Sequence, residues 1–370
     1  MKKANQKFPR FPLAGKSGGF SLVELMIAIT IGLILLGGIG YVYLGSRQTF
    51  RTQDDFSRIQ ENVRYALDQV GVEVRMAGYS GCVNLSSINP ANPTLIPINV
   101  IANGAPTVGL AEAMRGYDGS TWTAPGTAPA NWVAGTGVFH ITRAAAQGVN
   151  LTGNMTADNA NIEISSNPAG IVAEQALLIS DCVSADLFRA TNTPSAGNLT
   201  IAHGISNCSN LTPVVACNID NKLSKAYGAD AEVFAILSTT YFIGTNAANN
   251  PALYRREIVG TQVSAAEEMV DNVENIVMRF GIDTAPTDNN LVVNSYVSAS
   301  DFPTSTWTDW RQVLAARLSL VFRGNTNNIA TQVQPCVVEN AACPSAYTNT
   351  ADRRLRQVAT ATIGLRNRLP

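Results

Sequence analysis

The sequence predicts an α+β protein, in which one long N-terminal α-helix, transmembrane in its first half, packs on an elaborated antiparallel β-rich head. Three observations predict this fold class. The run from Leu25 to Leu44 contains no charged residue, and a helix of about 20 such residues spans a bilayer. A helical pattern of apolar residues then continues to Gly78. After Cys82, short β-branched and aromatic runs alternate with segments rich in Gly, Asn and Pro.

The N-terminal segment predicts an export leader with an unusual cleavage site. Residues 1–19 contain five basic residues and no acidic one. A secretory signal is cut after its apolar region, whereas the glycine pair ending at Gly19 precedes that region here. A cut between Gly19 and Phe20 would leave the apolar helix on the mature chain. By the positive-inside rule the leader stays in the cytoplasm and the chain after Leu44 lies beyond the membrane.

The helix is expected to continue past the membrane as an amphipathic segment. Apolar residues three and four positions apart line up on one face of a helix, and this face contains Phe56, Ile59, Val63, Ala66, Leu67, Val70 and Val74. Gly78 is a candidate C-cap. The resulting division is a cleaved leader 1–19, a membrane helix 20–45, an amphipathic helix 46–78 and a β-rich head 79–370.

The head is predicted to be mostly strands and loops. Residues 84–136 read as loops with short strands and one helical turn at 110–115, residues 260–273 as a helix or turn, and residues 300–312 as a loop with a short helix. Strands are expected at 137–143, 161–165, 171–180, 185–191, 231–243, 253–259, 273–283, 314–323 and 353–366.

The six cysteines indicate disulfides. An even number on the exported side of a membrane favours disulfide bonds, and the spacing lacks the tight Cys and His pairs of a zinc site. Proximity in sequence suggests the pairs Cys208–Cys217 and Cys336–Cys343, which leaves Cys82 with Cys182. Sequence alone does not fix connectivity, because six cysteines allow many pairings.

Composition and motifs argue against several function classes. The whole chain has a net charge of −1 and the leader holds five basic residues, which leaves about −6 for the remainder. No basic run is present, so no nucleic-acid contact is expected. The chain lacks G-x-S-x-G, H-E-x-x-H and Gly-rich dinucleotide motifs. Its two histidines are 63 residues apart, a poor basis for acid–base catalysis. We expect no catalytic residue, no metal site and no cofactor.

The run GFSLVELMIAI, residues 19–29, resembles the type IV prepilin signal. The resemblance implies that Gly19 precedes the cut made by prepilin peptidase and that Phe20 becomes the N-methylated N-terminus. It also implies that Glu24 neutralises a Phe20 amine during filament assembly. A carboxylate in a membrane helix is costly unless it is paired, and the helix start favours an anion.

Further blocks resemble the PilW family of type IV pilus minor pilins. They are EVRMAGYSGC (73–82), SDCVSADLF (180–188), ALYRRE (252–257), VENIVMRFGID (273–283) and the arginine-rich end, 353–368. The family implies a pilin-like fold and a structural subunit that starts in the inner membrane with a periplasmic head. The subunit then joins a minor-pilin complex that primes pilus assembly and is expected at the pilus tip.

The resemblance also implies a set of partners and of phenotypes. The partners would be other minor pilins, the major pilin, prepilin peptidase, the inner-membrane assembly platform and a tip adhesin. The phenotypes would be twitching motility, adhesion or DNA uptake. Two alternatives stay open. One is a minor pseudopilin of type II secretion, which shares the VENIVMRFGID block and the arginine-rich final strand. The other is a tip adhesin that binds through its loop-rich head.

Overall fold

A computed structural model gives the fold. It describes residues 19–82, 98–100, 102–103, 113–117, 119–205, 217–218, 221–259, 262–284, 292–301, 310, 313–338, 341–342 and 352–368. The chain divides into two compact units, residues 1–53 and residues 54–370. The predicted leader, apart from Gly19, lies outside the described residues.

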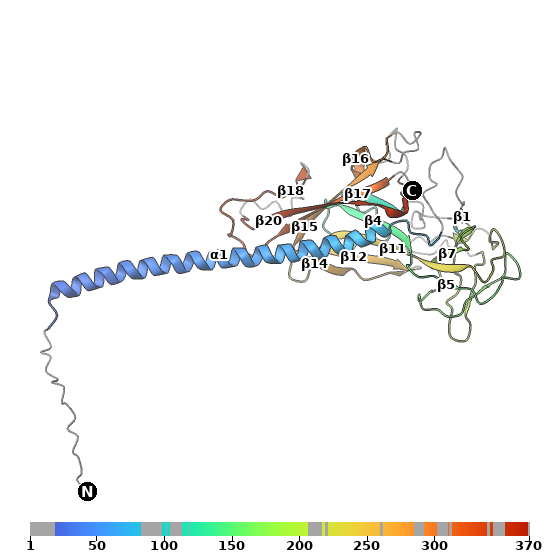
Figure 1. The fold of residues 1–370 in the computed structure, drawn as a ribbon, viewed down its shortest axis with the longest axis horizontal. Coiled ribbons are helices and arrows are strands. Elements are labelled where there is room, and N and C mark those ends of the chain that lie inside the picture. The colour runs from blue at the N-terminus through green and yellow to red at the C-terminus, as the bar shows by residue number, and fades with distance from the viewer. Residues whose placement is uncertain are drawn as a thin grey trace, which may run out of the picture. The chain divides into compact units, whose positions relative to one another are not determined.

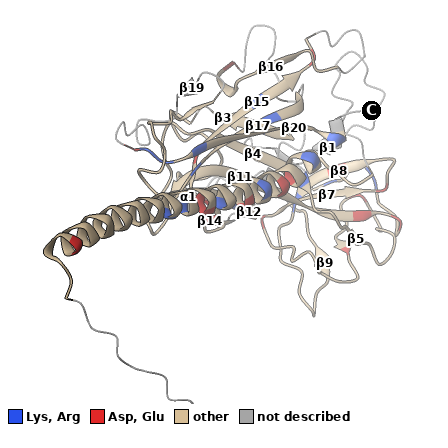
Figure 2. Ribbon diagram, turned by 60° about the vertical axis from the view of Figure 1, so that its left-hand side comes forward, with Lys and Arg blue, Asp and Glu red and all other residues tan. Residues whose placement is uncertain are grey.

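Helix α1 spans Leu22–Met76, two residues shorter at each end than the predicted Phe20–Gly78. Figure 2 shows one acidic band near its start, then a long uncharged stretch, then charges of both signs in its later part. The helix ends just before Gly78, the predicted C-cap, because Gly78 adopts the left-handed conformation with φ 72°, which glycine tolerates best. Gly78 N–H then donates to Thr142 O at 2.9 Å, so the chain leaves the helix by joining the sheet.

The second part of α1 buries one face in the head. Ile59, Ala66, Val70 and Val74 are buried, as their spacing predicted. Phe56 was predicted on this face but is 47% exposed, while the neighbouring Asp55 is buried. One residue turns a helix by about 100°, so the face that continues from Ile59 contains position 55 rather than position 56.

The head contains a large sheet built around one long strand, β11. Its order is β1-β8-β7-β11-β12-β13, with β3, β4, β5 and β14 joined at its sides (Figure 1). The first part of β11 pairs with β7 and β5, and its second part pairs with β4 and β12, all antiparallel. The strands are β1 Ile98–Val100, β3 Met114–Tyr117, β4 Val138–Ala144, β5 Val149–Asn150, β7 Ala176–Ser180, β8 Ala185–Arg189, β11 Glu232–Thr245, β12 Pro251–Val259, β13 Gln262–Val263 and β14 Glu267–Asp271.

A second sheet of four strands has the order β16-β15-β17-β20, all antiparallel. Its strands are β15 Val273–Ile282, β16 Ser295–Val297, β17 Val313–Arg323 and β20 Arg356–Gly364. Three small pairs complete the described strands. They join β2 Ala102–Asn103 with β10 Cys217–Asn218, β6 Ile162–Glu163 with β9 Thr200–Ile201, and β18 Val337–Val338 with β19 Ala341–Ala342. Short 3-10 helices lie at η4 Ala299–Asp301 and η7 Arg366–Arg368. The predicted α+β fold with an antiparallel β-rich head is confirmed.

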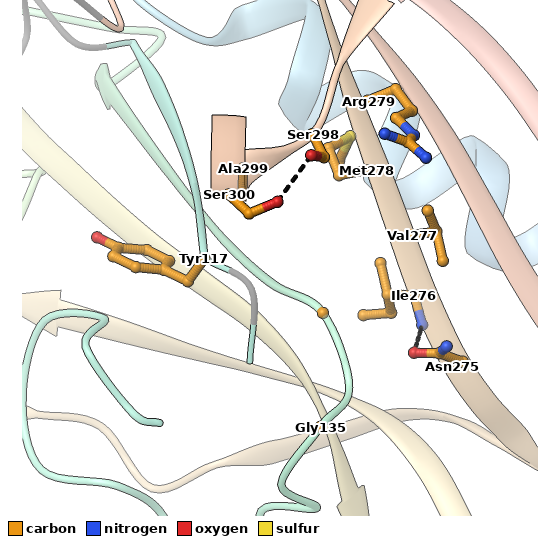
Figure 3. A pocket seen from close by; sticks show the side chains of 11 residues that line it. Tyr117, Gly135, Asn275, Ile276, Val277, Met278, Arg279, Ser298, Ala299 and Ser300 are labelled. Atoms are coloured by element: carbon orange, nitrogen blue, oxygen red, sulfur yellow. Dashed lines mark hydrogen bonds between the residues drawn. The ribbon is translucent and has the colours of Figure 1, made fainter. Parts of the chain in front are cut away.

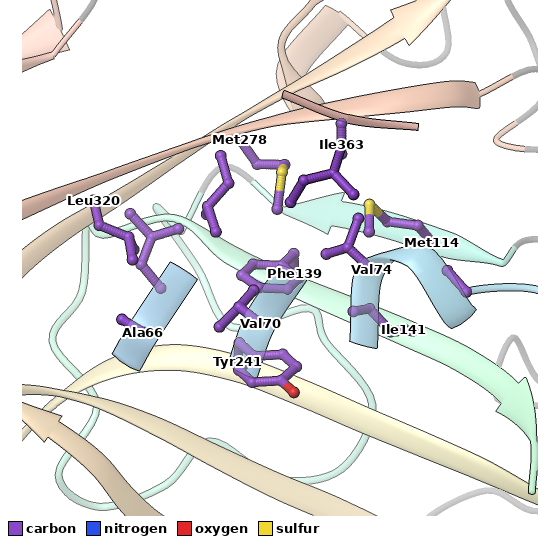
Figure 4. Packing of buried hydrophobic residues seen from close by; sticks show 14 of the residues in the cluster. Ala66, Val70, Val74, Met114, Phe139, Ile141, Tyr241, Met278, Leu320 and Ile363 are labelled. Carbon is purple, nitrogen blue, oxygen red and sulfur yellow. The ribbon is translucent and has the colours of Figure 1, made fainter. Parts of the chain in front are cut away.

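The main core lies between α1 and both sheets. Figure 4 shows Ala66, Val70 and Val74 of α1 facing side chains from the two sheets. The four-stranded sheet contributes Met278, Leu320 and Ile363, and the larger sheet contributes Met114, Phe139, Ile141 and Tyr241. We call the part of the head built on this core the helix lobe; it comprises residues 54–76, 113–144 and 236–368.

Residues 145–235 form a second part of the head, which we call the outer lobe. It has its own core, in which Ile162, Leu177, Phe188, Ile201 and Tyr227 are buried. No α1 residue belongs to this core. Strand β11 is shared, because Val233 and Ala235 belong to the outer core whereas Tyr241 and Ile243 belong to the main core.

Two local predictions were wrong. Residues 110–115 were predicted to hold a helical turn, but Met114–Tyr117 is strand β3, paired with β4. Residues 260–273 were predicted to be a helix or turn, but Glu267–Asp271 is strand β14, paired with β12. In β14 the side chains of Glu267 and Glu268 face solvent at the edge of the sheet, so their charges stay hydrated. Pairing with β12 therefore outweighs the low strand propensity of these residues.

Candidate functional site

The start of α1 is capped by its own side chains. Ser21 precedes the helix, and its Oγ accepts a hydrogen bond from Val23 N–H at 3.2 Å. Glu24 reaches back so that its Oε2 accepts from Ser21 N–H at 3.0 Å. This reciprocal arrangement is a capping box, which satisfies main-chain donors that a helix start leaves without partners. The resemblance to prepilins gave Glu24 only an assembly role; its capping role was not predicted, although the Ser-x-x-Glu spacing carries the signal.

The predicted cleavage position lies just before the helix. Phe20 is 89% exposed, and a side chain placed on Gly19 would meet no atom within 4 Å. Among the residues that the structure describes, none therefore requires glycine at position 19. Any requirement for glycine there comes from a protein that approaches the bond from outside.

The apolar span after Glu24 is exposed on all sides in this chain. Its large side chains, including Leu33, Leu36 and Ile39, are more than half exposed. The hydroxyl of Thr30 bonds to main-chain oxygens of the preceding turn at 3.0 and 2.8 Å, so this polar group is satisfied inside the helix. Within the described chain α1 is the one helix whose length and hydropathy suit a membrane span.

Polar contacts attach the second part of α1 to the helix lobe. Buried Asp55 accepts hydrogen bonds from Thr326 N–H at 3.0 Å and from its hydroxyl at 3.2 Å. Asn62 donates to the Asp271 carboxylate at 3.0 Å. Close to the end of α1, Glu73 accepts two hydrogen bonds from Arg143 of β4, each 2.9 Å long.

The first two of these contacts border a small polar cavity. Its volume is about 110 Å³, and its lining residues are Asp55, Arg58, Ile59, Glu61, Asn62, Asp271, Asn272, Arg323, Gly324 and Asn325. Asp55 and Asp271 are each engaged by the hydrogen bonds given above. Among the residues that the structure describes, no three His, Cys, Asp or Glu side chains gather in a way that could hold a metal ion.

A buried ion pair joins the strands of the four-stranded sheet. Glu274 is fully buried and accepts two hydrogen bonds from Arg356, at 2.7 and 3.0 Å. Asp352 accepts a further bond from Arg356 at 2.9 Å. Burial alone would lower the pKa of Arg356, but the hydrogen bond and charge of Glu274, together with Asp352, raise it above its usual value.

A larger cavity of about 310 Å³ opens beside β15 (Figure 3). Tyr117 and Gly135 lie on one side of it, the Asn275–Arg279 segment of β15 on the other, and Ser298–Ser300 at one end. The described residues that line it include no Asp, Glu, His or Cys. It therefore offers no carboxylate or imidazole for general acid–base chemistry.

The two histidines are buried in different places. His140 Nδ1 lies 2.8 Å from Thr240 Oγ1, and burial, followed by the charges of Arg256 and Arg115, lowers the pKa of His140 to about 3. His203 Nε2 lies 2.9 Å from Ala160 O, and its ring packs edge-on against Phe188. Each histidine belongs to a packed interior and neither lines a described cavity.

The structure contains the predicted Cys82–Cys182 disulfide, which joins the chain just after α1 to the outer lobe. Cys336 is also disulfide-bonded. Its predicted partner, Cys343, lies outside the described residues, as does Cys208, and the side chain of Cys217 is not described. The pairs Cys336–Cys343 and Cys208–Cys217 stay predictions.

Comparison with protein families gives two matches. The family described as type IV pilus-assembly protein W matches residues 240–367, which run from the second part of β11 to the end of the helix lobe. The prokaryotic N-terminal methylation motif matches residues 15–40, which include Gly19, Phe20 and Glu24. Searches of curated proteins and of solved structures returned no match.

The matched residues agree with part of the sequence analysis. The blocks at 252–257, 273–283 and 353–367 lie inside the matched range, whereas those at 73–82 and 180–188 lie outside both ranges. The outer lobe up to residue 235 is likewise unmatched. Pilin-family domains are structural, they associate with other pilus components, and the methylation motif with its apolar helix fits a membrane-anchored subunit. The chain is a PilW-like type IV pilin, of the minor-pilin kind.

Proposed function

We propose that this minor pilin is a non-enzymatic subunit that primes assembly of the type IV pilus and stays at or near its tip. One observation carries the proposal. The methylation motif coincides with a capped helix start whose apolar continuation is exposed on all sides. Exposed apolar surface of this extent requires lipid or other apolar helices. Other minor pilins, the major pilin and the assembly platform of the inner membrane would supply those helices and the docking sites for the head.

The head is proposed to lie in the periplasm before assembly and on the cell surface afterwards. The basic leader supports this orientation, because positive charges stay on the cytoplasmic side. The Cys82–Cys182 disulfide supports it independently, because such bonds persist in oxidising compartments. Protease added to spheroplasts should degrade the head, and protection of the head would contradict this orientation.

Prepilin peptidase is proposed to cut between Gly19 and Phe20, after which Phe20 is methylated. Gly19→Val tests the cut. A side chain at position 19 would meet no atom of the described chain within 4 Å, so the variant should fold normally and migrate on a gel as the uncut form. Gly19→Ala is the matched control for the size of the side chain. Normal cleavage of the Val variant would contradict the assignment.

Glu24 is proposed to pair with a Phe20 amine of the assembly, which would neutralise two charges in an apolar setting. Its capping role complicates the simple alanine test, because Glu24→Ala removes both the charge and a cap. Glu24→Gln keeps an acceptor for Ser21 N–H and removes only the charge. Ser21→Ala removes the hydroxyl of the cap and keeps the charge.

We expect all three of these variants to be cleaved. Glu24→Gln and Glu24→Ala should lose pili, as counted by electron microscopy, whereas Ser21→Ala should retain them. Normal piliation with Glu24→Gln would contradict the charge pairing. Loss of pili in Ser21→Ala, which keeps the charge, would show that Glu24 acts through helix capping.

Deletion of the whole gene tests the assembly role itself. Loss of pili, motility or DNA uptake, restored by the full chain, would support the proposal. Normal pili together with loss of protein secretion would instead support a pseudopilin. Normal pili with loss of attachment would support an adhesin, for which the unmatched outer lobe is the candidate surface. Deleting residues 84–136 is a poor test of adhesion, because it removes β3 and the buried Met114.

A further inference from the structure

We propose that the outer edge of β20 accepts an extended strand from a neighbouring subunit, by β-strand addition. Strand β20 is the last strand of the four-stranded sheet and pairs with β17 on one side. Within the described part of the chain, no strand pairs with its other side. This inference rests on the proposed function only in taking the partner to be a subunit of the same assembly.

The hydrogen-bond pattern shows which residues face the open edge. Just after β20, Leu365 N–H donates to Leu314 O at 2.9 Å, so the main-chain groups of Leu365 point toward β17. Main-chain groups alternate between the two sides of an antiparallel strand. The N–H and C=O groups of the residues at even positions therefore point to the open edge. Arg356, at the start of the strand, is one of them, and its N–H already donates to the Gln334 side chain at 2.5 Å; the others are Val358, Thr360, Thr362 and Gly364.

The other residues of β20 hold the strand in place. Ala359 and Ile363 are buried in the main core, against α1 and the rest of the helix lobe. At the start of the strand, Arg356 is anchored by Glu274. The edge is thus already extended and rigid, which lowers the entropy that a partner strand must lose on pairing.

The edge lacks the features that usually protect sheet edges. Residues 357–364 contain no charge and no proline, and the exposed even positions include Val358, 44% exposed, and two threonines. Strand β14, an edge strand of the larger sheet, presents Glu267 and Glu268 to solvent. Native proteins place charges on edges to prevent pairing with other chains. This contrast indicates that the β14 edge is protected against pairing with another chain, whereas the β20 edge is not.

The geometry also specifies the occupant. Successive outward-facing N–H and C=O groups repeat about every 6.8 Å along a strand, a spacing that another extended main chain matches and a compact small molecule does not. The uncharged, β-branched edge favours a partner segment of about five residues without charges, rich in Thr, Val or Ile. The geometry therefore points to an extended, uncharged segment of another pilus subunit.

Thr362→Pro tests the pairing through the main chain. Proline has no N–H, and Thr362 N–H makes no ladder bond within the sheet, so the fold should tolerate the change as edge strands do. Thr362→Val is the matched control, because it keeps the N–H and the shape and removes only the hydroxyl. A photo-crosslinking residue replaces Val358 in the full chain, which is expressed in piliated cells as wild type, Thr362→Pro or Thr362→Val.

We expect irradiation to join position 358 to one short segment of another subunit, with equal yield in the wild type and Thr362→Val. The yield in Thr362→Pro should fall about tenfold or more, since a donor is lost and the proline ring obstructs pairing. Thermal unfolding of each full chain in detergent shows whether the proline variant is folded. If the proline variant is unfolded, amide exchange of the wild type tests the pairing instead. The Thr360 and Thr362 amides should exchange about tenfold more slowly in the crosslinked wild-type complex than in the uncrosslinked chain.

Several results would overturn the inference. They are absence of a crosslink in piliated wild-type cells, crosslinks scattered over many partner segments, an equal yield in folded Thr362→Pro, or unchanged amide exchange at Thr360 and Thr362. A crosslink to a second copy of this chain would overturn the assigned occupant. Piliated cells without the crosslink leave the proposed function standing, whereas normal pili in cells that lack the protein contradict the proposed function itself.

Discussion

The helix lobe and the outer lobe are built differently from one shared strand. The helix lobe packs two sheets against α1, with large side chains such as Phe139, Tyr241 and Phe280 at its centre. The described residues of the outer lobe include no helix in its core, and they form short strands of two to five residues besides β11. The family match covers most of the helix lobe and none of the outer lobe. The lobe that resembles other pilins is thus the one organised by the helix.

The buried polar groups differ in the same way. In the helix lobe, ion pairs such as Glu274–Arg356 and Glu73–Arg143 join different secondary-structure elements. In the outer lobe, buried Asp186 accepts hydrogen bonds from Ser224 and Tyr227, and Asn218 bonds to main-chain atoms of Arg189. These bonds join β8 to segments outside its strand pairs with β1 and β7, and buried Arg189 of the same strand also forms an ion pair with Glu174. Without a helix to cover them, the loops of the outer lobe depend on such local bonds.

The segment after α1 connects the two lobes. Tyr79 O accepts from Ala144 N–H at 2.6 Å in the helix lobe, and the Tyr79 side chain packs against a cluster that includes Leu187 and Phe234. Gly81, with φ 70°, lies so close to Phe234 that an added Cβ would be 2.8 Å from its ring. Cys82 then forms the disulfide to Cys182. The outer lobe thus has a packed core of its own, and the disulfide and the Tyr79 contacts tie it to the end of the helix.

The largest expected effect comes from the buried ion pair of the helix lobe. Glu274→Ala leaves Arg356 buried with less compensation, and breaking such a pair costs about 3–5 kcal/mol. Denaturant unfolding of the full chain in detergent measures the loss, and amide exchange should rise in β15, β17 and β20 before β7 and β8. Glu274→Gln, which keeps the shape and an acceptor, should lose less. An equal rise of amide exchange in β7 and β8 would show that the two lobes do not unfold separately.

The disulfide should show the opposite pattern. Replacing Cys82 and Cys182 by serine removes a link between residues 100 apart in sequence, which stabilises a fold by about 2–4 kcal/mol. We expect amide exchange to rise first in β7 and β8, next to Cys182, with little change in β15 and β17. The single variant Cys82→Ser should match the double variant in exchange pattern. A uniform rise across the head would mean that the lobes unfold as one unit.

The docking face of α1 gives a matched pair of substitutions. Val70 is fully buried in the main core, whereas Val72, two residues on, is 53% exposed. Val70→Ala removes buried methyl groups and should cost about 2 kcal/mol, and Val72→Ala should cost less than about 0.5 kcal/mol. Thermal unfolding of the two variants checks the difference. Equal costs would show that the buried face of the helix is not the one assigned here.

His140 predicts a pH dependence specific to the helix lobe. Its pKa in the folded protein is lowered to about 3, by burial first and then by the nearby Arg256 and Arg115. The unfolded chain binds a proton below about pH 6.5, while the folded protein resists it, so stability falls as pH falls from about 6.5 toward 3. The expected slope is about 1.4 kcal/mol per pH unit. His140→Asn should unfold with a shallower pH dependence in that range, and an unchanged slope would contradict the buried neutral histidine.

Sequence patterns predicted the helix and the long strands because their signals are local. The spacing of Ile59, Val70 and Val74 is a property of the helix itself. The burial of Asp55 was not predictable, because its partner Thr326 is far away in sequence and only the fold brings them together. Strand β14 was missed for the same reason: Glu267 and Glu268 favour no strand alone, and β12 imposes it. At the helix start, the motif indicated processing, and the Ser21-x-x-Glu24 spacing also carried a capping signal, which was not used although it is local to the helix.

The smallest expected change in the free energy of unfolding comes from an exposed ion pair, which tests whether burial or distance sets the strength of such pairs. Arg255 and Glu267 form an ion pair across β12 and β14 with a contact of 2.8 Å, as short as that of Glu274 with Arg356, but Glu267 is mostly exposed. Water and salt screen such a pair, so Glu267→Gln should change the free energy of unfolding by less than about 0.5 kcal/mol. The same measurement in high salt should remove what difference remains. A loss of unfolding free energy near that of Glu274→Ala would mean that the strength of these ion pairs depends on distance rather than on burial. The interior and the edge of the helix lobe would then not differ in how strongly their ion pairs stabilise the fold.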